Sequence, residues 1–282
     1  MSLGWETMSL EEREREYSPS SCIGGEYAPF IDDYRRLSVA AHAAHPPASY
    51  RYGSKSTQTL DVFLPEVASG KPALLVFIHG GYWQELSKDD SAFAAPYCLA
   101  NGIALAAINY TLAPNATLDE IVSECVEAID WLTTFASVVG IDPNRIFVSG
   151  SSAGAHLAAM VALKRRSIRG AVLVSGIYDL GPLTGTSIDR PLKLSSRTIR
   201  ENSPLLEEIE SFPPSLIAWG EIETSQAKKQ SQAFAAHLVA AGTRCQSLEV
   251  SKRNHFDVIL DLADPGTALG AKVHTLINKG TI

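Results

Sequence analysis

Short apolar segments alternate along the chain with segments of helical periodicity. Two of the apolar segments, Leu74–Ile78 and Ala171–Val174, are continuously hydrophobic and do not alternate with polar residues. This pattern is typical of strands buried on both faces, as in a parallel sheet that is covered by helices. On these grounds we predict seven strands, at Thr59–Leu64, Ala73–His79, Ile103–Asn109, Arg145–Ser149, Gly170–Ser175, Ser215–Trp219 and Gln246–Val250.

Helices are predicted between the strands. Apolar residues recur at helical spacing from Leu118 to Leu132, and Gly140 is expected to end that region. Further helices are predicted at Ala153–Leu163, Thr224–Ala241 and Pro265–Asn278. Strands that alternate with helices through short connections indicate an α/β fold with a mostly parallel sheet. Ligand sites in such sheets lie at the carboxyl ends of the strands, so the residues that follow each strand are the first candidates for function.

The chain is predicted to form a single domain over residues 21–282, preceded by an N-terminal arm at residues 1–20. No linker, internal repeat or low-complexity tract divides the sequence. The motif Met-Ser-Leu stands at residues 1–3 and again at 8–10, so the first seven residues could be an added leader. The stretch 181–214 breaks the alternation, and we expect it to form a small helical, cap-like insertion over the edge of the sheet.

Composition and charge exclude several classes of function. The 282 residues include 24 Lys and Arg against 31 Asp and Glu, for a net charge of −7, which makes nucleic acid a poor partner. No apolar run approaches the ~20 residues of a membrane-spanning helix, so membrane insertion is not expected. The first twenty residues lack the apolar stretch of a signal peptide. The cysteines (22, 98, 125 and 245) are widely spaced and predict no metal site, so a reduced cytoplasmic location is expected, with Cys98 and Cys125 in the core.

Residues Gly150–Gly154 fit the pattern G-x-S-x-G, with Ser152 at its centre. A predicted strand precedes this motif and an Ala-rich helical segment follows it. A serine on such a tight turn exposes its hydroxyl at the positive N-terminus of the helix, as a catalytic nucleophile requires. A Gly/Ser turn that only caps a helix is the alternative. The strand before and the helix after favour the nucleophile.

The second predicted strand leads into His79–Trp83, which contains two consecutive glycines. Such glycines let the backbone curl, so that amide groups point into the cleft and can stabilise an oxyanion. The candidate donors are the amides of Gly81 and Tyr82, together with the amide of Ala153 after the nucleophile. An ordinary turn at a strand end is the alternative. His79 is expected to be a buried residue that holds this loop.

A serine hydrolase also needs a base and an acid, which follow the serine in the chain order Ser, acid, His. His255 lies in a loop shortly after the predicted strand Gln246–Val250, where a base is expected. The other histidines after the nucleophile stand in helical segments, at His156, His237 and His274.

The acid should follow the strand Ser215–Trp219. Glu223, three residues after Gly220, stands at the usual place, and its carboxylate would steady the imidazolium as an aspartate does. Glu221 is the rival candidate, and both glutamates could also be solvated surface residues.

Four aromatic residues follow predicted strand ends and could line an apolar pocket for an aryl group: Tyr82, Trp83, Tyr110 and Tyr178. Core packing is the alternative for each of them, because aromatic residues dominate protein cores too.

The segment His79–Trp83 resembles the HGGxW signature of the kynurenine formamidases (arylformamidases), which are α/β-hydrolases. Residues Glu16–Ser20 are similar to the opening segment of that family, His255–Asp257 to its histidine loop, and Ser175–Leu180 to the segment before its cap. The resemblance runs from about residue 10 to the C-terminus. It implies an α/β-hydrolase fold with helices on both faces of the sheet, Ser152 as nucleophile, His255 as base, and Glu223 where the family has Asp.

The implied activity is the hydrolysis of a small amide or ester through an acyl-enzyme, with N-formylkynurenine-type formamides first among the substrates. No metal or organic cofactor is needed for this chemistry. A general short-chain carboxylesterase is the alternative, and a non-catalytic small-molecule receptor of the same fold is a third. The expected partner is the small-molecule substrate, and the sequence leaves open whether the chain forms a homodimer.

Overall fold

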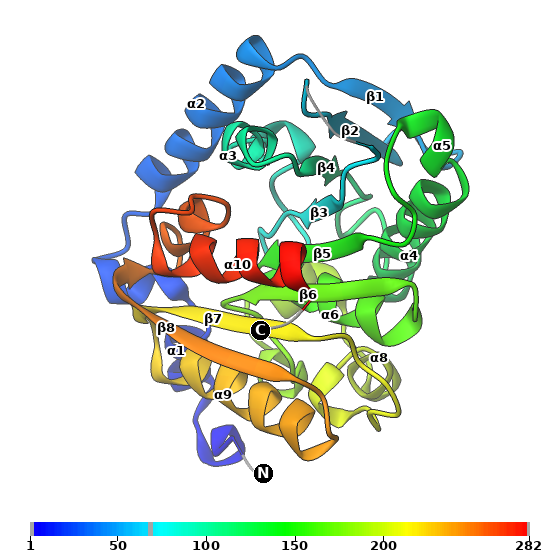
Figure 1. Cartoon of the computed structure of the whole chain (residues 1–282). Coiled ribbons are helices and arrows are strands. Elements are labelled where there is room, and N and C mark those ends of the chain that lie inside the picture. The colour runs from blue at the N-terminus through cyan, green and yellow to red at the C-terminus, as the bar shows by residue number, and fades with distance from the viewer. Residues whose placement is uncertain (1–2, 67–69, 281–282) are drawn as a thin grey trace.

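The protein is described here by a computed structural model that covers residues 3–66 and 70–280. Its centre is an eight-stranded sheet in the order β1-β2-β4-β3-β5-β6-β7-β8 (Figure 1). Strands β3 to β8 are parallel, whereas β2 is antiparallel to both of its neighbours. The strands are β1 (Ala48–Arg51), β2 (Thr59–Phe63), β3 (Leu74–Ile78), β4 (Ala104–Ile108), β5 (Ile146–Ser151), β6 (Ile168–Val174), β7 (Ser215–Ile222) and β8 (Cys245–Asn254).

Helices flank the sheet and the strands alternate with them, as predicted. The α-helices are α1 (Leu10–Glu16), α2 (Ala28–Ala44), α3 (Ala95–Ala100), α4 (Leu118–Thr134), α5 (Ala136–Val139), α6 (Ala153–Lys164), α7 (Asp189–Leu192), α8 (Ser196–Glu201), α9 (Ser225–Ala240) and α10 (Ala268–Lys279). Short 3-10 helices are η1 (Trp5–Thr7), η2 (Pro19–Ile23), η3 (Lys88–Asp90), η4 (Gly181–Leu183), η5 (Pro204–Leu206) and η6 (Val258–Asp261).

The sheet has a hydrophobic core on each face. Successive residues of β3 alternate between the two cores: Leu74, Val76 and Ile78 belong to one, and Leu75 and Phe77 to the other. This is the two-residue period of a strand that is buried on both sides, which explains the continuous apolar run in the sequence. Figure 1 shows α10 in front of the sheet and α6 behind it.

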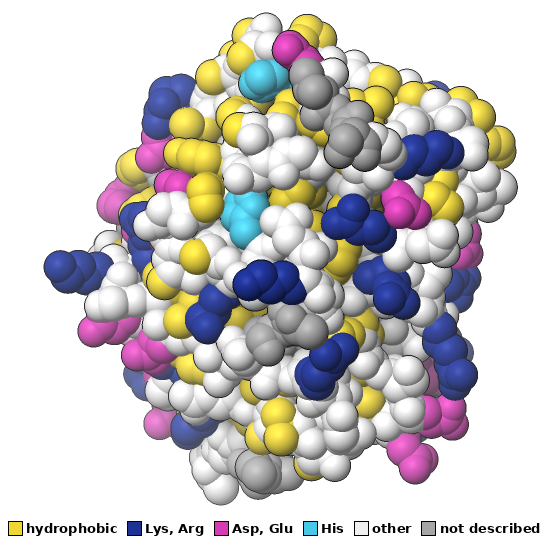
Figure 2. Space-filling view, in the orientation of Figure 1, with side chains coloured by type: hydrophobic (Ala, Val, Ile, Leu, Met, Phe, Trp, Pro, Cys, Tyr) yellow, Lys and Arg dark blue, Asp and Glu magenta, His cyan; other side chains and the backbone are white. Residues whose placement is uncertain are grey.

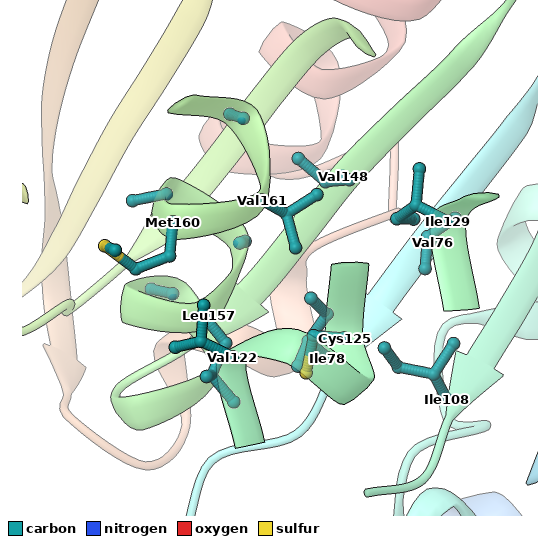
Figure 3. Packing of buried hydrophobic residues seen from close by; sticks show 14 of the residues in the cluster. Val76, Ile78, Ile108, Val122, Cys125, Ile129, Val148, Leu157, Met160 and Val161 are labelled. Atoms are coloured by element: carbon teal, nitrogen blue, oxygen red, sulfur yellow. The ribbon is translucent and has the colours of Figure 1, made fainter. Parts of the chain in front are cut away.

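The core behind the sheet is built by α4 and α6, which pack against strands β3, β4 and β5 (Figure 3). Each fully buried Leu, Ile or Val there stabilises the fold by about 1.5–3 kcal/mol. Helix α4 begins with a capping box between Thr117 and Glu120, so its start is specified locally as well. The labelled core residues are Val76, Ile78, Ile108, Val122, Cys125, Ile129, Val148, Leu157, Met160 and Val161.

The elements ahead of the first predicted strand were not predicted. Strand β1 is short and mostly exposed, so it lacks the apolar run that marks the other strands. Residues 10–44, of which 10–20 were expected to belong to the arm, contain α1, η2 and the 17-residue helix α2. Within the expected leader, Trp5 Nε1 donates a hydrogen bond to Asp179 Oδ2 at 2.9 Å, so this residue packs on the fold.

The stretch 181–214 contains four short helices, η4, α7, α8 and η5, in keeping with a small helical insertion.

All four cysteines lie among the described residues as free thiols, and Cys98 and Cys125 are buried as predicted. On the face shown in Figure 2, Lys and Arg side chains stand both near the centre and along the edges, with Asp and Glu mostly toward the edges. Over the residues that the structure describes, no helix combines the length and apolar character needed to cross a bilayer.

Candidate active site

Ser152 stands on the turn between β5 and α6. Its backbone has φ 56° and ψ −121°, a region that L-residues rarely adopt and that costs about 1–3 kcal/mol. Both flanking glycines are needed there. A Cβ on Gly150 would lie 2.3 Å from the carbonyl of Gly154, and one on Gly154 would lie 2.0 Å from the carbonyl oxygen of Ile78. The turn therefore holds Ser152 in a strained conformation that close packing on both sides maintains.

The base and acid candidates meet because the last two strands end together. Ile222 of β7 is in register with Asn254 of β8, so the next residues of the two strands, Glu223 and His255, come side by side. Nδ1 of His255 lies 3.0 Å from Oε2 of Glu223, whose side chain is fully buried. With its proton on Nδ1, the imidazole would keep Nε2 free to accept a proton, and Nε2 has no hydrogen-bond partner among the described residues.

Glu221 is placed differently from Glu223. It is exposed, and its Oε2 accepts hydrogen bonds from the amide of Lys252 at 2.7 Å and from the hydroxyl of Ser251 at 2.9 Å. These hydrogen bonds, the Lys252 amide first, lower the pKa of Glu221. The geometry therefore favours Glu223 over its rival as the acid.

The turn after β3 supplies backbone amides beside Ser152. Three consecutive residues, Gly81, Tyr82 and Trp83, have positive φ angles of 87°, 48° and 61°. The carbonyl of Gly81 accepts hydrogen bonds from the amides of Gln84 and Glu85, which closes the turn. The amides of Gly81, Tyr82 and Ala153 have no hydrogen-bond partner among the described residues, so all three remain candidate donors to an oxyanion.

His79 is buried and supports this turn, as the sequence predicts. Its ring stacks on Tyr110 with centroids 4.2 Å apart, and its Nδ1 lies 3.1 Å from the carbonyl oxygen of Gly80. Burial lowers the pKa of His79 to about 4, so the ring is neutral at the pH of the cell. It acts as a rigid support for the turn.

A cavity of about 370 Å³ opens at these residues and is lined by both Ser152 and His255. One side, which we call the aromatic wall, consists of Tyr27, Tyr34, Phe77, Phe93 and Phe256. Its rings stack in pairs, with Tyr27 5.5 Å from Phe256 and Tyr34 5.6 Å from Phe93 between centroids. A second group of lining residues, which we call the polar side, is more polar and consists of Glu14, Tyr17, Ser18, Tyr82, Gln84 and Ser187. A cavity of this size suits a small molecule with an aromatic group.

The BD-FAE family model matches residues 60–175. A kynurenine formamidase from Danio rerio is 32% identical to this chain, over 98% of this chain and 99% of its own length. One from Salmo salar is 30% identical, over 92% and 94%. This chain belongs to the kynurenine formamidase family. An esterase from Pyrobaculum calidifontis, 19% identical, superposes with a TM-score of 0.73 over 89% of this chain and 92% of that structure, and so shares the fold.

Membership of the kynurenine formamidase family confirms the resemblance drawn from the sequence. Together with the mostly parallel sheet and the esterase neighbour, it confirms the α/β-hydrolase fold. The chain is a hydrolase, as its relatives and its structural neighbours are.

In this family member, three of the four aromatic residues expected around the pocket lie elsewhere. Trp83, Tyr110 and Tyr178 are almost fully buried in the core and do not line the cavity in the described structure. Tyr110 supports His79, and Tyr178 stacks on Phe234 with centroids 4.4 Å apart. A residue that follows a strand can point into the core as readily as into the cleft. Tyr82 is the one of the four that lines the cavity, and its hydroxyl donates to the Tyr17 carbonyl.

The aromatic wall is not apparent from the sequence because most of it lies outside the ends of the predicted strands. Tyr27 and Tyr34 belong to the start of α2, which precedes every predicted strand. Phe256 follows His255 directly, so its position beside a candidate base was the one available signal. The hydroxyl of Tyr34 donates to the Phe256 carbonyl, which joins α2 to the histidine loop.

The remaining histidines after Ser152 have structural partners. Nε2 of His156 lies 2.7 Å from the Asn202 carbonyl oxygen, and Nε2 of His274 lies 2.7 Å from the Ala263 carbonyl oxygen. His156 is fully buried, and this burial lowers its pKa to about 4. Among the described residues, these two histidines do not line the cavity.

The low pKa of His156 predicts an acid-sensitive fold. Between pH 6.5 and about 4 the unfolded chain binds a proton at this residue and the folded chain does not, so stability is lost as the pH falls. One such group changes the free energy of unfolding by about 1.4 kcal/mol per pH unit. Urea unfolding of the His156→Gln variant at pH 6.5, 5.5 and 4.5 should show a slope smaller by about that amount. An unchanged slope would mean that His156 is protonated in the folded protein.

Proposed function

We propose that this chain is an arylformamidase-type serine hydrolase that releases small acyl groups from aromatic amines. The observation that carries the proposal is one cavity lined by the strained Ser152, by His255, whose Nδ1 faces the buried Glu223, and by Gly81 and Tyr82 of the turn after β3. A nucleophile, a base steadied by an acid and an oxyanion site are the groups that acyl transfer needs.

The proposed mechanism has two steps. His255 takes the proton from Ser152 as the serine oxygen attacks the carbonyl carbon, and the amides of Gly81, Tyr82 and Ala153 stabilise the oxyanion. His255 then gives its proton to the leaving amine or alcohol. Water hydrolyses the acyl-enzyme with His255 again as base. Glu223 keeps the imidazole in the required tautomer and stabilises its charged form throughout.

Two features of the cavity support an aryl-linked substrate with a small acyl group. The aromatic wall offers faces on which an aryl ring can stack, and such ring pairs contribute about 0.5–1.5 kcal/mol beyond burial. Tyr82 stands directly after the two glycines of the oxyanion turn and lines the cavity, where it limits the room for a long acyl chain. Membership of a family named for a formamidase points in the same direction.

The substrate class can be tested with two sets of compounds. We expect the kcat/KM for N-formyl-L-kynurenine to be high, and kcat/KM along a p-nitrophenyl ester series to fall steadily from acetate to decanoate, because added acyl bulk overlaps with Tyr82. Activity that climbs with acyl length, without hydrolysis of the formamide, would instead favour a carboxylesterase. The esterase neighbour and the shared ester chemistry of this site make that the second candidate.

The non-catalytic alternative is tested separately. A receptor of the same fold would not need an activated serine, so it should not react with a fluorophosphonate probe. We expect stoichiometric labelling at Ser152. We further propose a cytoplasmic location, which the four free thiols support.

A further inference from the structure

The acid candidate Glu223 is held on both of its oxygens. Oε2 faces His255, whereas Oε1 accepts two short hydrogen bonds, one from the hydroxyl of Ser175 at 2.6 Å and one from the amide of Gly220 at 2.6 Å. Ser175 is 1% exposed, so water does not compete for this contact. The mechanism proposed above gives the Ser175 hydroxyl no role.

The sheet brings Ser175 to this position by the pairing of β6 with β7. Val174, the last residue of β6, is in register with Ala218, and the amide of Ser175 continues the ladder by donating to the Ala218 carbonyl at 2.7 Å. Glu223 follows the end of β7. Side chains that follow neighbouring parallel strands therefore meet at the same edge as His255.

The backbone of Ser175 is unusual. Its φ is 52°, in the left-handed region that favours glycine, and Gly176 follows it without a positive φ. A serine in this conformation costs stability that a glycine would not. The presence of a serine at this strained position is explained if its hydroxyl has a role that glycine cannot fill.

We propose that Ser175 is a positioning residue for the proposed hydrolase, whose hydroxyl fixes the long side chain of Glu223 in the orientation that His255 requires. Glutamate has one more methylene group than aspartate, the acid of the Ser-His-Asp triad, and so one more torsion to be fixed. Beside an ionised carboxylate the hydroxyl can only donate. Its hydrogen bond and that of Gly220 together hold Oε1, which leaves Oε2 pointed at Nδ1 of His255.

The test is the rate at which a fluorophosphonate probe labels Ser152, because this rate reports activation of the serine whatever the natural substrate. In Ser175→Gly the hydroxyl is lost while the backbone strain is relieved, so the variant should fold. We expect labelling to slow by about ten- to a hundredfold, the usual loss for a hydrogen bond to a charged group. With any hydrolysed substrate, kcat should fall by a similar factor and KM should change less than about twofold.

Three further variants separate positioning from packing. Ser175→Ala loses the same hydroxyl but keeps the strain, and it should be slowed as much as Ser175→Gly. Ser149→Ala removes another buried serine hydroxyl, one that donates to the Val76 carbonyl at 3.0 Å, and should label at the normal rate. In the Glu223→Gln background, Ser175→Gly should slow labelling less than twofold further, because its effect passes through the carboxylate.

The outcomes are distinct. Normal labelling of a folded Ser175→Gly protein would overturn this inference and leave the proposed function intact. An equal loss in Ser149→Ala would also overturn it, since any buried hydroxyl near the site would then matter. No labelling of the unaltered chain would overturn the proposed function, and the inference with it.

Discussion

Replacing Ser152 with Ala is expected to lower kcat by about four to six orders of magnitude, which is the usual cost of removing a serine nucleophile. The loss should be this large because no acyl-enzyme can form without the serine oxygen, while the oxyanion site and the cavity stay in place. The fold should survive, because Ala is smaller than Ser and adds no atom to a turn that is already closely packed on both sides. Steady-state kinetics and intact-mass measurement after fluorophosphonate treatment would show the loss of turnover and of the adduct.

Ser151 provides the matched control for this variant. It is the adjacent residue, it carries the same hydroxyl, and it also lines the cavity, but it belongs to the extended strand β5 instead of the strained turn. Ser151→Ala should keep most of the activity and form the normal adduct. An adduct on the Ser152→Ala protein, or a Ser151→Ala protein that is equally inactive, would contradict the assignment of the nucleophile.

The second large effect is expected at the acid. Glu223→Gln should lower kcat by about 10⁴, because a buried amide can neither hold the proper tautomer of His255 nor stabilise its positive charge. Gln has nearly the same shape and can still accept the hydrogen bonds from Ser175 and Gly220, so stability should change little. Turnover should be measured together with thermal unfolding to separate the two effects.

Glu221→Gln is the control for the acid, since it makes the same chemical change two residues away. Glu221 is exposed, and its hydrogen bonds come from Ser251 and Lys252 of β8 and not from His255. This variant should therefore keep at least about half of the activity. If Glu221→Gln were the inactive variant, the turn after β7 would be placed wrongly by two residues.

The sheet could be predicted because the sequences of its central strands contain continuous apolar runs. A strand segment buried on both faces must be apolar throughout, as in β3 and in residues 171–174 of β6. Helix α2 could not be predicted in this way. Its buried face is Tyr34, Ser38 and Ala41, in which a polar residue is buried because its hydroxyl accepts a hydrogen bond from the Ala92 amide at 3.0 Å. Because one of the three buried positions is a serine, the sequence of α2 shows no clear hydrophobic periodicity.

The polar groups of the candidate site could be located because they depend on chain order and strand ends. The glycines around Ser152 and the position of Glu223 relative to Gly220 are local features. The walls of the cavity depend instead on the directions of side chains after the strands. Tyr82 and Trp83 are neighbours in the sequence, yet one lines the cavity and the other is buried in the core. Local spacing does not distinguish these two outcomes.

The polar side of the cavity has a consequence for the order in which the molecule assembles. Glu14 and Ser187, which both line the cavity, are joined by hydrogen bonds from the Ser187 amide and hydroxyl to the Glu14 carboxylate at 2.6 and 2.8 Å. Outside the cavity, the neighbouring Arg13 donates to the carbonyls of Pro182 and Thr184, at 2.9 and 2.7 Å, and the Glu16 carbonyl accepts from Thr224 at 2.6 Å. These contacts join residues about 170 to 210 positions apart. A chain synthesised from its N-terminus therefore makes these residues early, and it supplies their partners only after strands β3 to β6. Because such distant contacts are slow to close, the cavity is expected to be completed after the central strands have paired.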